Sequence, residues 1–367
     1  MKAIKEFIRL NKKMFYVLCG VVGVFVLILI ILLIVKLVSG TKISYEQLQD
    51  KMVIAAENYY YDNTETLPKN EGDEISISID TLVEKGYLKS LDKLVDASCS
   101  GSVVVKKNGE QYMYYPSLDC GSDYKTRTIG SIITDQSNIV ESGDGLYKTE
   151  DGYVFRGEYV NNYVTFADST WRIISIDNNG NIRMVKDNYL EDDYSWDDRY
   201  NVEADDETGI NDYKKSRIKK SLEKMYNDNT LVDETNKKHL IMYNLCIGKR
   251  NSSEYALSKN IDCSETVPAH IGLLSLYEVK MPSLDKNCTN IDTESCGNYN
   301  YFSNFMYGSL FSNSVNDNTY EVYAGKASYT YLTDARYESS IYPVIVISSK
   351  EIYVSGNGSE ENHFIVK

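Results

Sequence analysis

The stretch NNYVTFADSTWRIISIDNNGNIRMV, from Asn161 to Val185, decides the fold class of the larger part of this chain. Residues 163–166, 171–176 and 182–186 are rich in β-branched and aromatic side chains, and turn-forming residues separate these runs. Such runs are typical of β-strands, and the Asn178-Asn179-Gly180 cluster is a turn signal. We therefore predict consecutive β-strands in a strongly β region.

Further strand and helix patterns lie on both sides of this stretch. Residues 153–156 predict a strand upstream, while Ile218, Leu222 and Met225 place one apolar stripe on a helix over residues 212–226. Later segments predict a second helix over 231–245, a short strand over 271–274, a helical turn over 276–281, and strands over 342–348, 351–354 and 363–366. Strands mixed with helices predict one α+β domain over residues 151–367.

Four further motifs accompany the opening stretch in order and spacing. They are NDYKKSRIKKSLEKMY (residues 211–226), IGLLSLYEV (271–279), YPVIVISS (342–349) and GNGSEENHFIV (356–366). With these motifs, the chain resembles an uncharacterised family of bacterial surface domains related to the C-type-lectin-like fold of formylglycine-generating enzymes. The resemblance implies a C-type-lectin-like α+β domain over residues 151–367.

An uninterrupted apolar run extends from Phe15 to Val35. At about 1.5 Å per residue it is long enough to cross the roughly 30 Å hydrocarbon core of a bilayer. A cleaved signal peptide is the competing interpretation, but its apolar core would be only about 7 to 15 residues long. Basic residues are concentrated before the run, so we predict a cytoplasmic tail over 1–14, a transmembrane helix over 15–35, and an extracellular remainder held by an uncleaved signal-anchor in the cell membrane.

The charge of the chain limits its partners. The formal net charge is −14, and because residues 1–42 are basic, the rest of the chain is more acidic still. A polyanion repels phosphate backbones and anionic lipid surfaces. We therefore expect no nucleic-acid partner and no membrane contact beyond the single-pass anchor.

Six of the seven cysteines lie in the predicted extracellular part, where an even count suits disulfides. Residues 101–106 and 110–115 predict a hairpin closed by a type I′ turn at Asn108-Gly109, which would bring Cys99 and Cys120 together. A bond closing a loop of this size contributes roughly 3 kcal/mol in the chain-entropy model. Sequence proximity alone supports the remaining two predicted pairs, Cys246 with Cys263 and Cys288 with Cys296.

The region next to the apolar run predicts a small α+β domain over residues 43–125. Ser44 and Gln47 form a capping-box pattern ahead of a helix over 44–61, and a short helix and the hairpin follow. An apolar helix leading into an amphipathic one, the LVEKGYL segment at 82–88 and the disulfide-bounded hairpin resemble pilin-like and pseudopilin-like surface proteins, which implies pilin-like partners. Residues 126–150, rich in Gly, Ser, Thr and Asp, predict a linker.

No motif specifies a reaction. The chain has no GxSxG, GxxxxGK[ST], GxGxxG or HExxH sequence, and we predict that it is not an enzyme and takes no cofactor. Acidic clusters at residues 191–198 and 203–207 could hold calcium, but they lack the EF-hand order. Solvated acidic loops are the other interpretation, and we predict no metal site.

These observations predict a protein of a bacterial cell surface that recognises or adheres to a glycan or protein ligand without converting it. Aromatic side chains in loops are the candidates for stacking on a ligand: Trp196, Tyr200, Tyr299, Tyr301 and Tyr307. One alternative is a structural subunit that assembles with pilin-like partners. The other is a degenerate formylglycine-generating-type enzyme, in which Cys246 would serve as a redox nucleophile.

Overall fold

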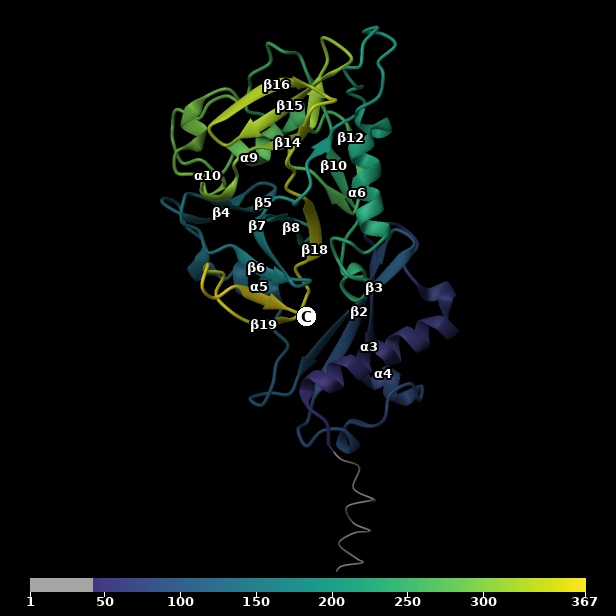
Figure 1. The fold of residues 1–367 in the computed structure, drawn as a ribbon. Coiled ribbons are helices and arrows are strands. Elements are labelled where there is room, and N and C mark those ends of the chain that lie inside the picture. The colour runs from purple at the N-terminus through teal and green to yellow at the C-terminus, as the bar shows by residue number, and fades with distance from the viewer. Residues whose placement is uncertain (1–41) are drawn as a thin grey trace, which may run out of the picture. The chain divides into compact units, whose positions relative to one another are not determined.

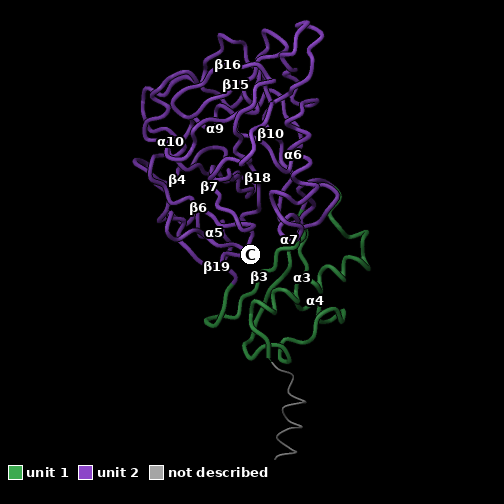
Figure 2. Tube along the Cα trace, viewed as in Figure 1, with its two compact units in different colours: residues 1–69, 74–105, 114–125 green, residues 70–73, 106–113, 126–367 purple. Residues whose placement is uncertain are grey.

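The computed structural model describes residues 42–367, which form two compact units (Figure 2). Unit 1 comprises the described residues up to 69 together with 74–105 and 114–125, and unit 2 comprises 70–73, 106–113 and 126–367. The predicted cytoplasmic tail and transmembrane helix lie outside the described residues. Within residues 42–367, no helix is both long and apolar enough to cross a bilayer.

Unit 1 begins with helix α3, Tyr45–Asp62. The Ser44 hydroxyl accepts from the Gln47 amide while the Gln47 side chain accepts from the Ser44 amide, so the predicted capping box is confirmed. The buried residues of the helix recur at helical spacing and include Leu48, Met52 and Ala55. This apolar face is the signal that made the helix predictable.

A three-stranded sheet lies mostly in unit 1, in the order β1 (Glu74–Ser78), β2 (Ser100–Asn108) and β3 (Gln111–Asp119), and residues 106–113 of its hairpin belong to unit 2. The predicted hairpin and its Cys99–Cys120 disulfide are confirmed. The predicted turn is wrong in its position, by one residue, and in its type. Asn108 ends β2, and Gly109 and Glu110 form the turn. Of these two, only Gly109 has a positive φ (60°), which fits a type II′ turn, since type I′ needs both.

The main sheet of unit 2 contains the strands predicted from the opening stretch (Figure 1). Its order is β13-β18-β8-β7-β6-β20-β19, with β5 and β4 attached to the edge of β7. Only the β20–β6 pair is parallel in this sheet as described. The strands are β4 (Gly145–Thr149), β5 (Gly152–Arg156), β6 (Tyr163–Phe166), β7 (Ser169–Asp177), β8 (Asn181–Lys186), β13 (Ile271–Gly272), β18 (Val344–Ser348), β19 (Tyr353–Ser355) and β20 (Phe364–Val366).

A second sheet in unit 2 was not predicted. It has the order β11 (Lys249–Arg250), β14 (Ser309–Val315), β15 (Glu321–Lys326) and β16 (Tyr329–Asp334). Its strand β14 is fully buried although it contains Ser312, Asn313 and Ser314. The Asn313 amide donates to the Gly248 carbonyl oxygen at 3.0 Å, and its side-chain oxygen accepts from the Leu276 amide at 3.0 Å. Hydrogen bonding thus offsets the cost of burying the polar residues of β14. Because of these polar residues, the sequence of β14 does not show the apolar run expected of a buried strand.

The helices of unit 2 correct two predictions. The predicted linker over 126–150 is wrong, because helix α5 (Ile129–Ile133) packs its isoleucines into the core and β4 joins the sheet. The helix predicted over 231–245 is also wrong: only α7 (Glu234–Lys237) forms, capped by Asp233, and strand β10 (Tyr243–Cys246) follows. Helix α6 (Arg217–Asn227), with Ile218 and Leu222 buried, agrees with the prediction.

The remaining elements are short. Strand β10 (Tyr243–Cys246) pairs with β12 (Thr266–Ala269), and β9 (Tyr194–Ser195) pairs with β17 (Glu338–Ser339). The other helices are α4 (Ile79–Glu84), α8 (Lys259–Asp262), α9 (Leu276–Lys280) and α10 (Phe302–Phe305), and single 3-10 turns lie at Thr64–Thr66, Leu91–Lys93, Gln136–Asn138, Tyr213–Lys215 and Glu294–Gly297. The predicted α+β class is confirmed for the described residues.

Candidate functional site

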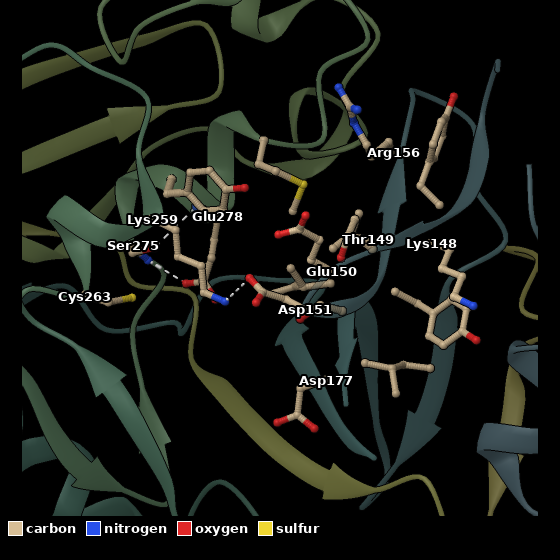
Figure 3. A pocket seen from close by; sticks show the side chains of 18 of the residues that line it. Lys148, Thr149, Glu150, Asp151, Arg156, Asp177, Lys259, Cys263, Ser275 and Glu278 are labelled. Carbon is tan, nitrogen blue, oxygen red and sulfur yellow. Dashed lines mark hydrogen bonds and ion pairs between the residues drawn. The ribbon is translucent and has the colours of Figure 1, made fainter. Parts of the chain in front are cut away.

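Unit 2 contains a cavity of about 470 Å³, which we call the Tyr277 pocket (Figure 3). Residues 147–156 from the β4–β5 hairpin form one part of its lining, and residues 174–177 of β7 form another. Residues 275–281 at the start of α9, Lys259 and the Cys246–Cys263 disulfide complete it. Cavities of roughly 300–1,000 Å³ are typical of small-molecule sites.

The lining of the Tyr277 pocket combines aromatic rings with aliphatic side chains. Tyr147, Tyr153 and Tyr277 are half-buried, so part of each side chain remains accessible. Burial is the main cause that raises the pKa of Tyr277 above its usual value, which keeps its hydroxyl protonated at neutral pH. Ile174 and Ile176 of β7 add apolar surface. Rings beside aliphatic groups form a surface on which a flat apolar face of a ligand could stack.

Glu278 is held in place by its own helix and by a partly buried cation, Arg183. It is the third helical residue after the cap Ser275, whose backbone amide donates to the Glu278 Oε2 atom at 2.9 Å. The Arg183 guanidinium forms an ion pair with the same carboxylate. Burial alone would lower the pKa of Arg183, but Glu278 and Tyr243 more than offset this and raise it. The carboxylate is therefore fixed in position.

Other carboxylates of the lining also have partners. Figure 3 shows Lys259 reaching Asp151, with 2.7 Å between its Nζ and the Oδ2 atom. Asp177 closes the turn after β7, since its Oδ1 atom accepts from the amides of Asn179 and Asn181, at 2.9 Å each. These hydrogen bonds and the ion pair hold the two carboxylates in place.

Arg156, at the end of β5, differs from these groups. Its Nη2 atom donates to the Ser283 carbonyl oxygen at 2.7 Å, and its guanidinium carbon lies 5.3 Å from the centre of the Tyr147 ring. The Nε atom is buried and has no hydrogen-bond partner. Arg156, Tyr277 and Met281 also line a neighbouring cavity of about 220 Å³.

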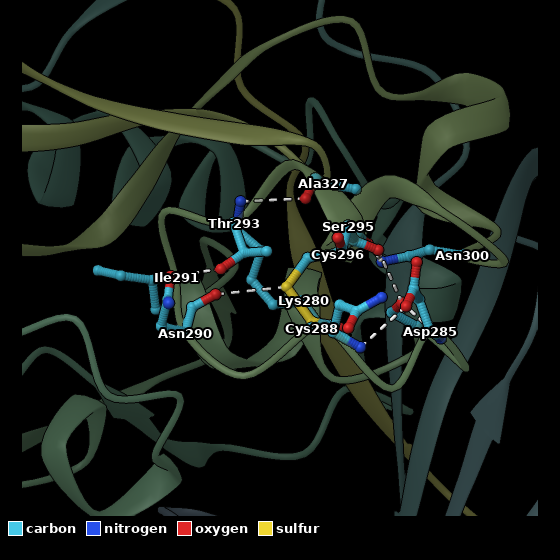
Figure 4. The surroundings of a disulfide bond; sticks show 12 residues. Lys280, Asp285, Cys288, Asn290, Ile291, Thr293, Ser295, Cys296, Asn300 and Ala327 are labelled. Carbon is cyan, nitrogen blue, oxygen red and sulfur yellow. Dashed lines mark hydrogen bonds between the residues drawn. A yellow bond between two sulfur atoms is a disulfide. The ribbon is translucent and has the colours of Figure 1, made fainter.

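All six cysteines of the described residues form disulfides, in the three predicted pairs. Cys246 and Cys263 contribute to the wall of the Tyr277 pocket. Figure 4 shows the Cys288–Cys296 bond beside Lys280. Cys246, the redox nucleophile of the enzyme alternative, is thus oxidised in this structure.

The aromatic residues predicted as ligand contacts lie elsewhere, and two of them are core residues. Trp196 is 0% exposed, and its Nε1 atom donates to the Phe311 carbonyl oxygen at 3.0 Å. Tyr301 is also 0% exposed and stacks on Phe302 with 4.6 Å between ring centres. The prediction that Trp196 and Tyr301 stack on a ligand is wrong, because their faces are packed against protein.

The other three predicted aromatic residues are accessible but do not line the Tyr277 pocket. Tyr200, Tyr299 and Tyr307 are exposed by 51%, 59% and 77%. The pocket instead uses tyrosines that the prediction missed. Tyr147 lies in the segment interpreted as a linker, and Tyr277 lies within the IGLLSLYEV motif. Besides that motif, the predicted strands over 153–156 and 171–176 and the predicted Cys246–Cys263 pair also contribute to the lining.

The acidic clusters form no grouped ligand set. Within residues 42–367, no group of three or more His, Cys, Asp or Glu side chains is placed to hold a metal ion. In the first cluster, Asp197 is buried and forms a bidentate ion pair with Arg199. In the second, Asp205 accepts a hydrogen bond from the Tyr200 hydroxyl.

No family model, curated protein or solved structure significantly matches this chain. The resemblances to lectin-like and pilin-like proteins therefore stay predictions.

Proposed function

We propose that this protein recognises a glycan at the cell surface, without converting it, through the Tyr277 pocket of unit 2. The observation that carries the proposal is the pocket itself, in which three tyrosines and fixed hydrogen-bonding groups surround about 470 Å³. Its lining combines a large hydrophobic surface with a few positioned polar groups, as small-molecule sites do.

The chemistry of the lining matches that of a sugar ring. A pyranose ring has an apolar C–H face and an edge of hydroxyl groups. The C–H face can stack on Tyr147, Tyr153 or Tyr277, while the hydroxyls donate to acceptor oxygens such as those of Glu278. Because Ser275 and Arg183 already hold the Glu278 carboxylate, binding costs little side-chain ordering there.

Two observations favour recognition over the enzyme alternative. The cysteines of the described residues are all paired, so a thiol-dependent reaction would first require reduction of a disulfide. The Cys246–Cys263 bond is also part of the pocket wall, which gives it a structural role.

We further propose that the protein works outside the cytoplasm, anchored in the cell membrane. Three disulfides suit an oxidising compartment outside the cytoplasm. The apolar run at residues 15–35 would anchor the chain in the membrane, with the lectin-like unit 2 presented for adhesion. Unit 1, with its long helix, hairpin and disulfide, supports the pilin-like interpretation and is where pilin-like partners would bind.

A tyrosine substitution in the pocket tests the proposal. The purified full chain, kept in mild detergent, is screened on a glycan array, and affinities for the glycans it binds are measured by calorimetry. Tyr277→Ala removes one stacking surface and is expected to weaken binding by about ten-fold, which corresponds to about 1.4 kcal/mol. Tyr307→Ala, an exposed tyrosine outside the pocket, is the control and should bind like the wild type. Failure of the wild type to bind any glycan, or full affinity in Tyr277→Ala, would contradict the proposal.

A further inference from the structure

We infer that the glycan bound by the Tyr277 pocket carries an oxyanion group, a carboxylate, phosphate or sulfate, and that Arg156 binds it. This inference rests on the proposed function and adds the chemical class of the ligand. Four observations support it: the unpartnered Arg156 Nε atom, the absence of a carboxylate partner, the packing that fixes the guanidinium, and the second cavity that shares this residue.

The first observation concerns the donors of Arg156. A guanidinium has five N–H donors, and one of those on Nη2 is used by the Ser283 carbonyl oxygen. The buried Nε–H group has no acceptor. Leaving a buried donor unpaired costs about 1–3 kcal/mol, and more when the group is charged. Because the Nε atom is buried, a ligand acceptor would instead meet the three N–H donors that remain on Nη1 and Nη2.

The second observation concerns charge. Among residues 42–367, no carboxylate forms an ion pair with Arg156, whereas Asp151 pairs with Lys259 and Glu278 pairs with Arg183. Figure 3 shows Arg156 apart from the Asp151 and Asp177 carboxylates. The other lining cation without an ion pair is Lys148, which is solvent-exposed at the rim. Arg156 is therefore the partly buried positive charge that a ligand anion would meet.

The third observation is that the protein fixes the guanidinium in place. The carbonyl of Ser283 anchors one end, and the Tyr147 ring packs against the group at 5.3 Å. A fixed planar guanidinium matches the two oxygens of a carboxylate or the oxygens of a phosphate or sulfate. Because its orientation is set before binding, less entropy is lost when the anion arrives.

The fourth observation is the room available around Arg156. Arg156, Tyr277 and Met281 line both the Tyr277 pocket and the smaller cavity of about 220 Å³, so the two spaces adjoin at these side chains. A sugar ring can stack in the larger space while its charged substituent reaches Arg156. Asp285 also lines the smaller cavity, and its two carboxylate oxygens accept from the Asn287 backbone amide at 2.8 Å and the Asn298 side-chain amide at 2.7 Å. Glu150, at the exposed rim of the larger space, would repel a bare anion but accept from sugar hydroxyls. The lining thus favours an acidic sugar over a simple inorganic anion.

Matched pairs of neutral and acidic sugars test the inference. Calorimetry with the full chain compares glucose and galactose oligomers with their uronic acid counterparts, and N-acetylglucosamine with its 6-phosphate and 6-sulfate. At least one acidic member is expected to bind about ten-fold more tightly than its neutral counterpart. Inorganic phosphate alone is expected to bind much more weakly. The carboxylate, phosphate and sulfate arms identify which oxyanion is recognised.

Two matched variants locate the charge preference. Arg156→Gln should remove the preference, so that the acidic sugar loses about ten-fold more affinity than its neutral counterpart. Lys148→Gln, which removes the exposed rim cation, should keep the preference. If Arg156→Gln fails to fold, Arg156→Lys keeps the charge but loses the planar donor pair, and should lose most of the preference. An equal preference in Arg156→Lys and the wild type would overturn the inference.

The outcomes separate the inference from the proposed function. Equal affinities for every neutral and acidic pair would overturn the inference while glycan recognition stands. No binding to any sugar would overturn the proposed function and the inference with it. Raising the salt concentration from about 50 to 500 mM should weaken acidic binding several-fold and leave neutral binding unchanged, because salt screens the ion pair. If the preference for the acidic sugar did not change with salt concentration, this would also contradict the role of Arg156.

Discussion

Lys280→Met is expected to abolish a rise in stability that the wild type shows between about pH 6 and pH 9. Lys280 is 0% exposed, and its Nζ atom donates to the carbonyl oxygens of Lys326 and Ala327, both at 3.0 Å. Figure 4 shows the bond to Ala327. Burial lowers the pKa of Lys280 to about 7, and the charge of Asp292 only partly opposes this. A neutral amine has two N–H donors, which is the number that these two carbonyls accept.

The direction of the effect follows from proton linkage. Below about pH 7 the lysine is protonated in both the folded and the unfolded chain, and the fold bears the cost of a buried charge. Between about pH 7 and the unfolded pKa of about 10.4, the folded chain has lost the proton while the unfolded chain still holds it. Stability therefore increases with pH across this range, by about 2.5 kcal/mol between pH 6 and pH 9.

Urea denaturation at several pH values measures this effect. The informative quantity is the difference in unfolding free energy between the wild type and Lys280→Met, because other titrating groups contribute equally to both. That difference should shift by about 2.5 kcal/mol in favour of the wild type as the pH rises from about 6 to 9. In the control variant Lys148→Met, which changes an exposed lysine, the unfolding free energy should depend on pH as it does in the wild type. Parallel curves for Lys280→Met would show that Lys280 keeps its proton when buried.

Removing Asp262 is expected to cause the largest loss of stability of any single substitution considered for this protein. Asp262 and Arg250 are both fully buried, with 2.6 Å between the Arg250 Nη2 and Asp262 Oδ1 atoms. The other carboxylate oxygen accepts from the backbone amide of Tyr277 at 2.6 Å. Asp262→Ala leaves a buried guanidinium without a counter-ion and should cost about 3–5 kcal/mol. Since Asp262 also holds the Tyr277 backbone, glycan affinity should fall as well.

A surface ion pair provides the matched control. Lys224 and Asp228 are four residues apart on and just after helix α6, and both side chains are largely exposed. Asp228→Ala should change stability by less than about 0.5 kcal/mol, because exposed pairs are screened by water and salt. The double variant Arg250→Met with Asp262→Leu should recover part of the lost stability, because it removes both buried charges. Equal losses in Asp262→Ala and Asp228→Ala would contradict the account of the buried pair.

Helices and strands could be predicted where a short stretch of sequence carries the pattern typical of them. Helix α3 was predicted from its capping box and apolar face, and the strands between residues 163 and 186 from their composition. The Cys99–Cys120 pair followed from the hairpin. Strand β14 was missed because it buries polar side chains that hydrogen bonds satisfy, and no local pattern reports such bonds.

The site depended on tertiary contacts that a single sequence does not contain. Aromatic residues near turns suggested exposure, but Trp196 and Tyr301 are surrounded by the core. The pocket brings together the β4–β5 hairpin and the start of α9, which are more than one hundred residues apart. Its distinguishing feature, the unpartnered Nε atom of Arg156, exists only after these segments pack.

A crystal structure of the full chain with a bound glycan tests the central claim most directly. The ligand is chosen as the tightest binder from the array. Our account predicts electron density for a sugar ring against Tyr147, Tyr153 or Tyr277, with an acidic substituent within hydrogen-bond distance of Arg156. A glycan bound on the exposed surface around Tyr299 and Tyr307, with the Tyr277 pocket holding only solvent, would contradict it.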